Sequence, residues 1–202
     1  MNTAEQFHVD QVSPSYWRVT FDNGPVNLLD PDTVDQLGAL LARIEDDPDL
    51  TVVVFRSDRP GYFMAQWDFL ADNTRVAGMR PGPTGLHPYL DNFIRLSKLP
   101  VAEYGYVNRV IPDAEIEDFT DAFARRIAAF GKVAVTGIKE LVDVATLPAD
   151  EEFAPGLAAY FATAGRAENR PFVQLLLANG LQQPDGIETN LGTAIGKLRQ
   201  DA

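Results

Sequence analysis

Residues 51–70, with the sequence TVVVFRSDRPGYFMAQWDFL, constrain the fold of this chain more than any other stretch. The run Val-Val-Val-Phe at residues 52–55 is β-branched and aromatic, and turn-forming residues follow it, which indicates a buried strand that ends in a turn. A shorter apolar segment at residues 63–65 then leads to Asp68 and to an alternation of apolar and polar residues. The sequence therefore predicts a strand, a turn and the start of a helix, in that order.

A strand that leads into a helix N-terminus leaves backbone N–H groups without partners inside the helix. Such groups can hold a carbonyl oxygen that gains negative charge during a reaction. The N–H of Trp67 would be such a donor. The same pattern also fits an ordinary core strand followed by a helix that Asp68 caps, and the residues alone leave both interpretations open.

The start of the chain predicts a second strand and the first helix. Residues 16–21 alternate and are rich in aromatic residues, and the turn Asp-Asn-Gly-Pro follows them. Asp30 and Pro31 then supply a helix cap and a first-turn proline. The helix is expected to continue to Asp46, because apolar residues recur at helical spacing at Val34, Leu37, Leu40, Leu41 and Ile44.

The order of these elements and motifs resembles the crotonase superfamily, the enoyl-CoA hydratases and isomerases. Its motif F-x-A-G-x-D-[LI] is matched at Phe63, Ala65, Asp68 and Phe69, with Gln66 at the usual glycine and Trp67 at a usually small residue. Asn27 and Leu28 stand at its N-A-L motif. The resemblance implies that the N–H of Trp67 is half of an oxyanion hole for an acyl-CoA thioester, and that Ala65, Gln66 and Asp68 contribute to substrate binding.

The centre of the family pattern has no counterpart in this chain. Residues 98–102, Lys-Leu-Pro-Val-Ala, resemble the end of a family helix, whereas residues 103–111 resemble a strand that comes much later in the family. The catalytic glutamates and the glycine-rich turn with the second oxyanion donor would lie between them. We therefore expect an α/β fold, a shortened crotonase-like ββα spiral, with an incomplete β/α domain at 1–102 and a mainly helical region at 103–202.

The second half of the sequence predicts helices. Asp113 is expected to cap a helix that ends at Gly131, and residues 132–144 predict another. Residues 151–172 resemble the C-terminal family pattern, and a tail at residues 175–197 continues beyond its usual end. Family helices of this kind pack on neighbouring subunits, and missing central strands leave edges that tend to pair with another chain. We expect a homo-oligomer, which the resemblance implies to be a trimer or hexamer.

Composition excludes several classes of partner and site. The net charge of −12 argues against binding to nucleic acid or an anionic membrane. Cys-based chemistry is excluded because there is no cysteine, and no metal site is expected. The N-terminus lacks signal-peptide features and no apolar run approaches the ~20 residues that span a bilayer, so we expect a cytoplasmic protein. A basic patch for coenzyme A could come from Arg56, Arg59, Arg75 and Arg80.

The expected function is binding of, or action on, acyl-CoA thioesters, as an enoyl-CoA hydratase or isomerase would perform. Catalysis is expected to be impaired, because loss of one oxyanion donor typically costs ~10²–10³ in rate and the family's acid and base are not found. Asp68, Asp72 and Asp91 are possible substitutes for them. No separate cofactor is expected, since coenzyme A is part of the substrate. The alternatives are a non-catalytic assembly subunit and a truncated product of a crotonase homologue.

Overall fold

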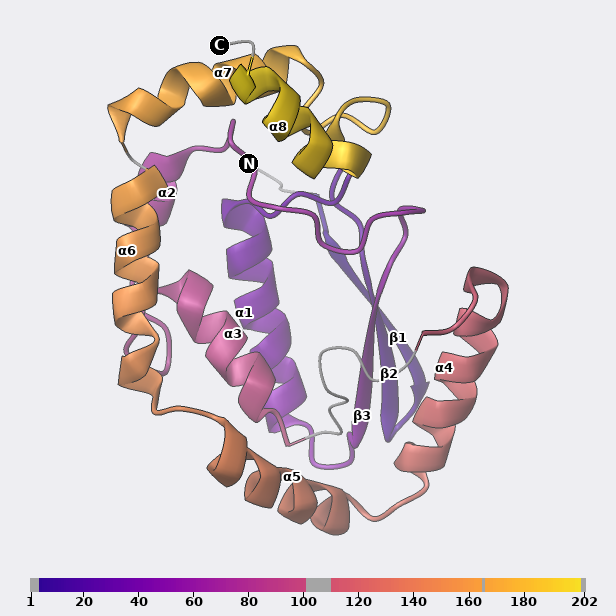
Figure 1. Cartoon of the computed structure of the whole chain (residues 1–202). Coiled ribbons are helices and arrows are strands. Elements are labelled where there is room, and N and C mark those ends of the chain that lie inside the picture. The colour runs from indigo at the N-terminus through magenta and orange to yellow at the C-terminus, as the bar shows by residue number, and fades with distance from the viewer. Residues whose placement is uncertain (1–3, 101–109, 165, 201–202) are drawn as a thin grey trace.

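The computed structural model describes residues 4–100, 110–164 and 166–200. Its sheet has three strands in the order β1 (Phe7–Ser13), β2 (Tyr16–Phe21) and β3 (Val52–Ser57). The first two strands pair antiparallel as a hairpin, and β3 pairs parallel with β2. Helix α1 (Pro31–Asp46) makes the crossover between the parallel strands, which gives a ββα unit (Figure 1).

The sheet separates two apolar clusters because successive side chains of a strand point to opposite faces. On one face, Trp17, Val19 and Phe21 of β2 pack against Leu41 and other apolar residues of α1. On the other face, Tyr16 packs against Ala124 of a later helix, α4 (Asp113–Ala128). Figure 1 accordingly shows the sheet between α1 and α4.

The start of α1 confirms the helix cap expected from the sequence. The Asp30 carboxylate accepts a hydrogen bond from the Thr33 N–H at 2.8 Å, and the Thr33 hydroxyl lies 3.1 Å from the Asp30 N–H, which completes a capping box with Pro31 in the first turn. Burial alone would raise the pKa of Asp30, but hydrogen bonds from Thr33, Gln6 and Asn23 hold that pKa below its usual value. The cap is therefore kept in its charged form.

The remaining helices follow in sequence. They are α2 (Asn73–Ala77), α3 (Pro88–Lys98), α4, α5 (Lys132–Thr146), α6 (Ala154–Ala164), α7 (Arg170–Ala178) and α8 (Leu191–Gln200), with 3₁₀ turns η1 (Asp150–Glu152), η2 (Ala167–Asn169) and η3 (Glu188–Asn190). Helix α3 packs on α1, where the Asn92 side chain donates to Val34 O at 2.7 Å and Arg95 pairs with Glu45. The described residues beyond 110 contain helices and no strand, as the sequence predicts.

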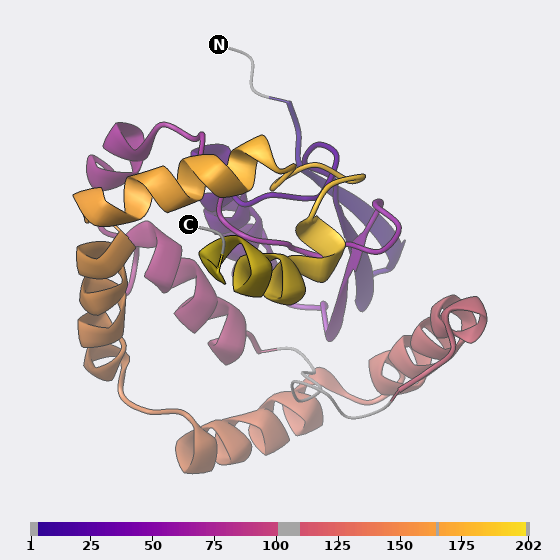
Figure 2. The same cartoon turned by 45° about the horizontal axis from the view of Figure 1, so that its top comes forward.

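Helices α4, α5 and α6 run one after another along the outside of the molecule (Figure 2). They bury little of their apolar surface: in α6 no described side chain is buried, and in α5 only Lys139 is. Val133, Leu141 and Val144 of α5 are 89%, 75% and 87% exposed. The apolar faces of these helices are therefore available to another chain.

Three local predictions need comment. The helix expected to start at Asp68 is wrong: residues 68–71 form a turn, and α2 begins only at Asn73, where Asp72 accepts from the Thr74 N–H. Asp113 is the first residue of α4 and not its cap, which is Pro112 without a side-chain hydrogen bond. The strand expected at residues 103–111 falls largely outside the described residues. Within the described part of the chain, no helix is long and apolar enough to cross a membrane.

Candidate functional site

The predicted site residues Ala65, Gln66, Trp67 and Asp68 lie in an extended segment that pairs with residues 27–29. The Ala65 N–H donates to Asn27 O at 3.0 Å, the Leu29 N–H to Gln66 O at 2.8 Å, and the Asp68 N–H to Leu29 O at 2.8 Å. These bonds form a parallel bridge between Leu29 and Trp67. The pairing draws residues 65–68 into a strand-like conformation, which is why no helix begins at Asp68.

The bridge fixes the direction of the Trp67 backbone. Because backbone groups of successive strand residues point to opposite edges, Gln66 O and the Asp68 N–H face residues 27–29, and the N–H and C=O of Trp67 face the other edge. The sequence predicted that this N–H is a hydrogen-bond donor at the N-terminus of a helix. In the structure its orientation comes from strand pairing instead.

Asn27, at the place of the N-A-L motif, holds the segment against the sheet. It is fully buried and has a left-handed backbone with φ of 54°, a conformation that asparagine tolerates better than most residues. Its side-chain Nδ2 lies 3.2 Å from Phe21 O, 2.8 Å from Ser57 Oγ and 3.0 Å from Phe63 O. One amide group therefore joins the ends of β2 and β3 to the start of the site segment.

The opposite edge of the segment faces a loop near the C-terminus, residues 180–188. The Nε2 of Gln182 donates to Asp68 Oδ1 at 3.1 Å and lies 3.5 Å from Trp67 O. The Nε2 of Gln66 lies 3.0 and 3.2 Å from the two carboxylate oxygens of Glu188. Gln66 and Asp68 are thus brought together with two residues that sequence reasoning missed. The turn-forming Gly180, Pro184 and Gly186 could have indicated a compact loop there, but not its contacts.

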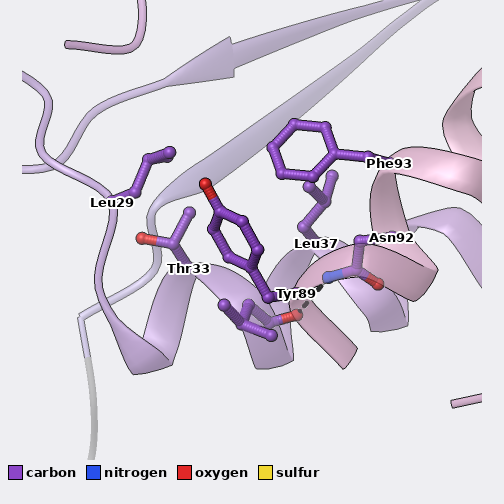
Figure 3. Close-up of a pocket in the computed structure, with 7 residues that line it drawn as sticks. Leu29, Thr33, Leu37, Tyr89, Asn92 and Phe93 are labelled. Atoms are coloured by element: carbon purple, nitrogen blue, oxygen red, sulfur yellow. Dashed lines mark hydrogen bonds between the residues drawn. The ribbon is translucent and has the colours of Figure 1, made fainter. Parts of the chain in front are cut away.

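A small apolar cavity of about 10 Å³ lies between α1 and α3, beside Leu29 (Figure 3). The ring of Tyr89 projects into this region and meets the ring of Trp67 edge-on, with centroids 5.7 Å apart. Burial, and then the nearby Tyr160, raise the pKa of Tyr89, so its hydroxyl stays neutral. A cavity of this size holds about one water molecule. It is lined by Leu29, Thr33, Val34, Leu37, Tyr89, Asn92 and Phe93.

Three of the four arginines that the sequence offered for a basic patch are engaged in ion pairs. Arg59 pairs with Asp22, Arg56 with Glu117 at 3.0 Å, and Arg75 with both Asp32 and Asp35. Within the described residues, no group of three or more His, Asp or Glu side chains could hold a metal ion.

Comparison with known proteins identifies the fold. No family model and no curated protein sequence matches the chain. Its structural neighbours are enoyl-CoA hydratase or crotonase-like proteins, and the chain has their fold in a shortened form, with a helical C-terminal region. This confirms the fold expected from the sequence motifs.

One similar structure is that of a proposed enoyl-CoA hydratase from Streptomyces avermitilis, with a TM-score of 0.83 and 20% identity over 97% of this chain and 99% of that one. An enoyl-CoA hydratase from Bacillus anthracis has a TM-score of 0.55 and 14% identity, over 84% of this chain and 95% of that one. An enoyl-CoA hydratase/isomerase family protein from Silicibacter pomeroyi has a TM-score of 0.56 and 13% identity, over 77% and 98%. At these identities the likeness concerns the fold.

Proposed function

We propose that the chain binds acyl-CoA thioesters, with the thioester oxygen accepting a hydrogen bond from the N–H of Trp67. The observation that carries this proposal is the Leu29–Trp67 bridge, which turns this N–H away from residues 27–29. Ala65, Gln66 and Asp68 form the rest of the binding segment. The fold shared with enoyl-CoA hydratases supports the choice of ligand.

The chemistry that one donor supports is limited. Hydration or isomerisation of an enoyl thioester passes through an enolate, whose oxygen carries negative charge, and two convergent N–H groups stabilise it best. With one donor, the turnover rate is expected to be about 10²–10³-fold lower than with two donors. Coenzyme A enters as part of the substrate, and the proposal needs no separate cofactor.

The surroundings suit a ligand with a long apolar part. Phe63, Phe69 and Leu70 flank the segment and are 51%, 39% and 73% exposed. Contact with an acyl or pantetheine chain would remove their apolar surface from water, at about 25 cal/mol per Å² buried. If Arg56, Arg59 and Arg75 bound the phosphates of coenzyme A, their guanidinium groups would contact these phosphates as well as their present carboxylate partners.

Trp67→Pro tests the proposed hydrogen bond. Proline lacks the N–H, whereas the ladder bonds to Leu29 use the backbone groups of Gln66 and Asp68 and are kept. We expect calorimetry to show that crotonyl-CoA binds the wild-type chain, and Raman spectroscopy to show a lowered thioester C=O frequency in the complex. Trp67→Pro should lose that shift.

Trp67→Ala is the matched control, because it removes the ring and keeps the N–H; it should retain the lowered frequency. The proposed function would be wrong if crotonyl-CoA did not bind the wild-type chain, or if Trp67→Pro kept the full shift.

A second candidate function is that of a non-catalytic assembly subunit, which the exposed apolar faces of α5 and α6 favour. A second copy of the chain is the partner that the fold suggests. Sedimentation velocity should give three or six times the 22.2 kDa of one chain. The double variant Leu141→Glu and Val144→Glu should lower this mass, while Glu140→Gln on the same helix should not. A monomer that proteases degrade rapidly would instead support a truncated product.

A further inference from the structure

The loop at residues 180–188 has a compact, specific conformation. Gly180 has φ of 90° and Gln182 has φ of 67°, and a Cβ atom on Gly186 would lie 1.9 Å from Gly180 O. Leu181 and Gln182 are 2% and 4% exposed. The loop is therefore built to hold its polar side chains in fixed positions against the site segment.

Glu188 is held by neutral amide donors on this loop and on the site segment. Its carboxylate accepts from the Gln182 N–H at 2.8 Å and lies 3.0 and 3.2 Å from Gln66 Nε2. The side chain is only partly buried. These contacts orient a carboxylate beside Gln66, the residue that precedes Trp67. The same loop reaches the outer edge of Trp67 through Gln182, whose Nε2 lies 3.5 Å from Trp67 O.

A second observation at this edge points to a ligand. The Oε1 of Gln182 is buried and has no hydrogen-bond partner within the described part of the chain, although Nε2 of the same side chain binds Asp68. A buried acceptor without a donor costs about 1–3 kcal/mol. A water molecule or a substrate amide brought to this edge would satisfy it.

The carboxylates that the sequence offered have other tasks. Asp68 accepts from the Leu70 N–H at 2.8 Å and closes a turn, and Asp72 caps α2. Asp91 is 1% exposed and binds Thr84 and Arg95. Glu188 differs from these three in that its carboxylate is held between the Gln66 side chain of the binding segment and the Gln182 N–H of the loop.

We propose that Glu188 is the proton-transfer base of this site, with Gln66 and Gln182 as its positioning residues; this inference rests on the proposed function. Glu188 removes a proton from the carbon next to the thioester carbonyl. The C–H electron pair moves into the C–C bond and the carbonyl π electrons move to oxygen, which the Trp67 N–H holds. Return of the proton from the Glu188 carboxyl to carbon regenerates both the thioester and the base.

Exchange of the α-protons of butyryl-CoA in D₂O tests this step directly, because it needs neither hydration nor isomerisation. We expect the wild-type chain to catalyse exchange, as followed by NMR. Glu188→Gln preserves the shape of the side chain and should lower the exchange rate by at least about 100-fold. The Kd of the Glu188→Gln variant for butyryl-CoA should differ from that of the wild-type chain by less than about threefold. Asp185→Asn, on the same loop and exposed, is the matched control and should exchange at the wild-type rate.

Glu188→Asp covers the case in which Glu188→Gln does not fold. It keeps the charge and withdraws the carboxylate by one methylene, and should slow exchange by at least about tenfold. Absence of butyryl-CoA binding to the wild-type chain would overturn the proposed function itself. Binding without exchange, or a Glu188→Gln variant that exchanges within threefold of wild type, would overturn the role of Glu188 alone.

Discussion

Replacing Phe21 by alanine is expected to lower the free energy of unfolding by about 3–5 kcal/mol. Phe21 has no exposed surface, and its ring centroid lies 4.9 Å from that of Phe7 on the neighbouring strand. It belongs to the cluster that joins β2 to α1. Removing the ring leaves a cavity that close-packed neighbours fill only in part, so the cost exceeds the loss of apolar burial.

Urea unfolding followed by circular dichroism at a fixed protein concentration measures this effect. Phe63→Ala is the control, because that side chain is 51% exposed, and it should change the free energy of unfolding by less than about 0.5 kcal/mol. If the two variants proved equally stable, the assignment of Phe21 to the core would be wrong.

Replacing Asn27 by alanine should cost about 3–5 kcal/mol for a different reason. The substitution leaves Phe21 O and Phe63 O without the amide that now lies 3.2 and 3.0 Å from them. It also places a residue with an unfavourable left-handed preference at φ of 54°. Since the same amide holds the site segment, crotonyl-CoA binding should weaken together with stability.

Asn27→Gly separates the two causes. Glycine accepts the left-handed backbone but supplies no amide, so it should recover about 1 kcal/mol of stability relative to Asn27→Ala without restoring binding of crotonyl-CoA. Urea unfolding and calorimetry on the same preparations make the comparison. An Asn27→Ala variant with wild-type stability would contradict the role assigned to this side chain.

The elements that the sequence predicted correctly are those with local causes. Helix α1 begins at Asp30 and Pro31 because a capping side chain and a first-turn proline act within four residues, and its apolar stripe repeats inside the helix. Strands β2 and β3 follow from short runs of alternating or β-branched residues. The motif that contains Asn27 was recognised, although its hydrogen bonds were not.

The elements that the sequence did not predict depend on distant contacts. Asp68 and Asp72 are both good capping residues, and only the pairing with Leu29 decides that the helix starts after the second. Strand β1 was not anticipated. Gln182 and Glu188 meet the site segment across 114 to 122 residues, a separation that no local pattern encodes.

The contact between Gln66 and Glu188 also bears on how this architecture tolerates change in length. This contact closes a loop of the chain whose ends are 122 residues apart in sequence and which contains helices α2 to α7. The entropy of closing such a loop varies with the logarithm of its length. Doubling or halving the loop length therefore alters the free energy of loop closure by only about 0.6 kcal/mol. Variants of this chain could therefore gain or lose whole helices between these two residues, and the contact between Gln66 and Glu188 would still form.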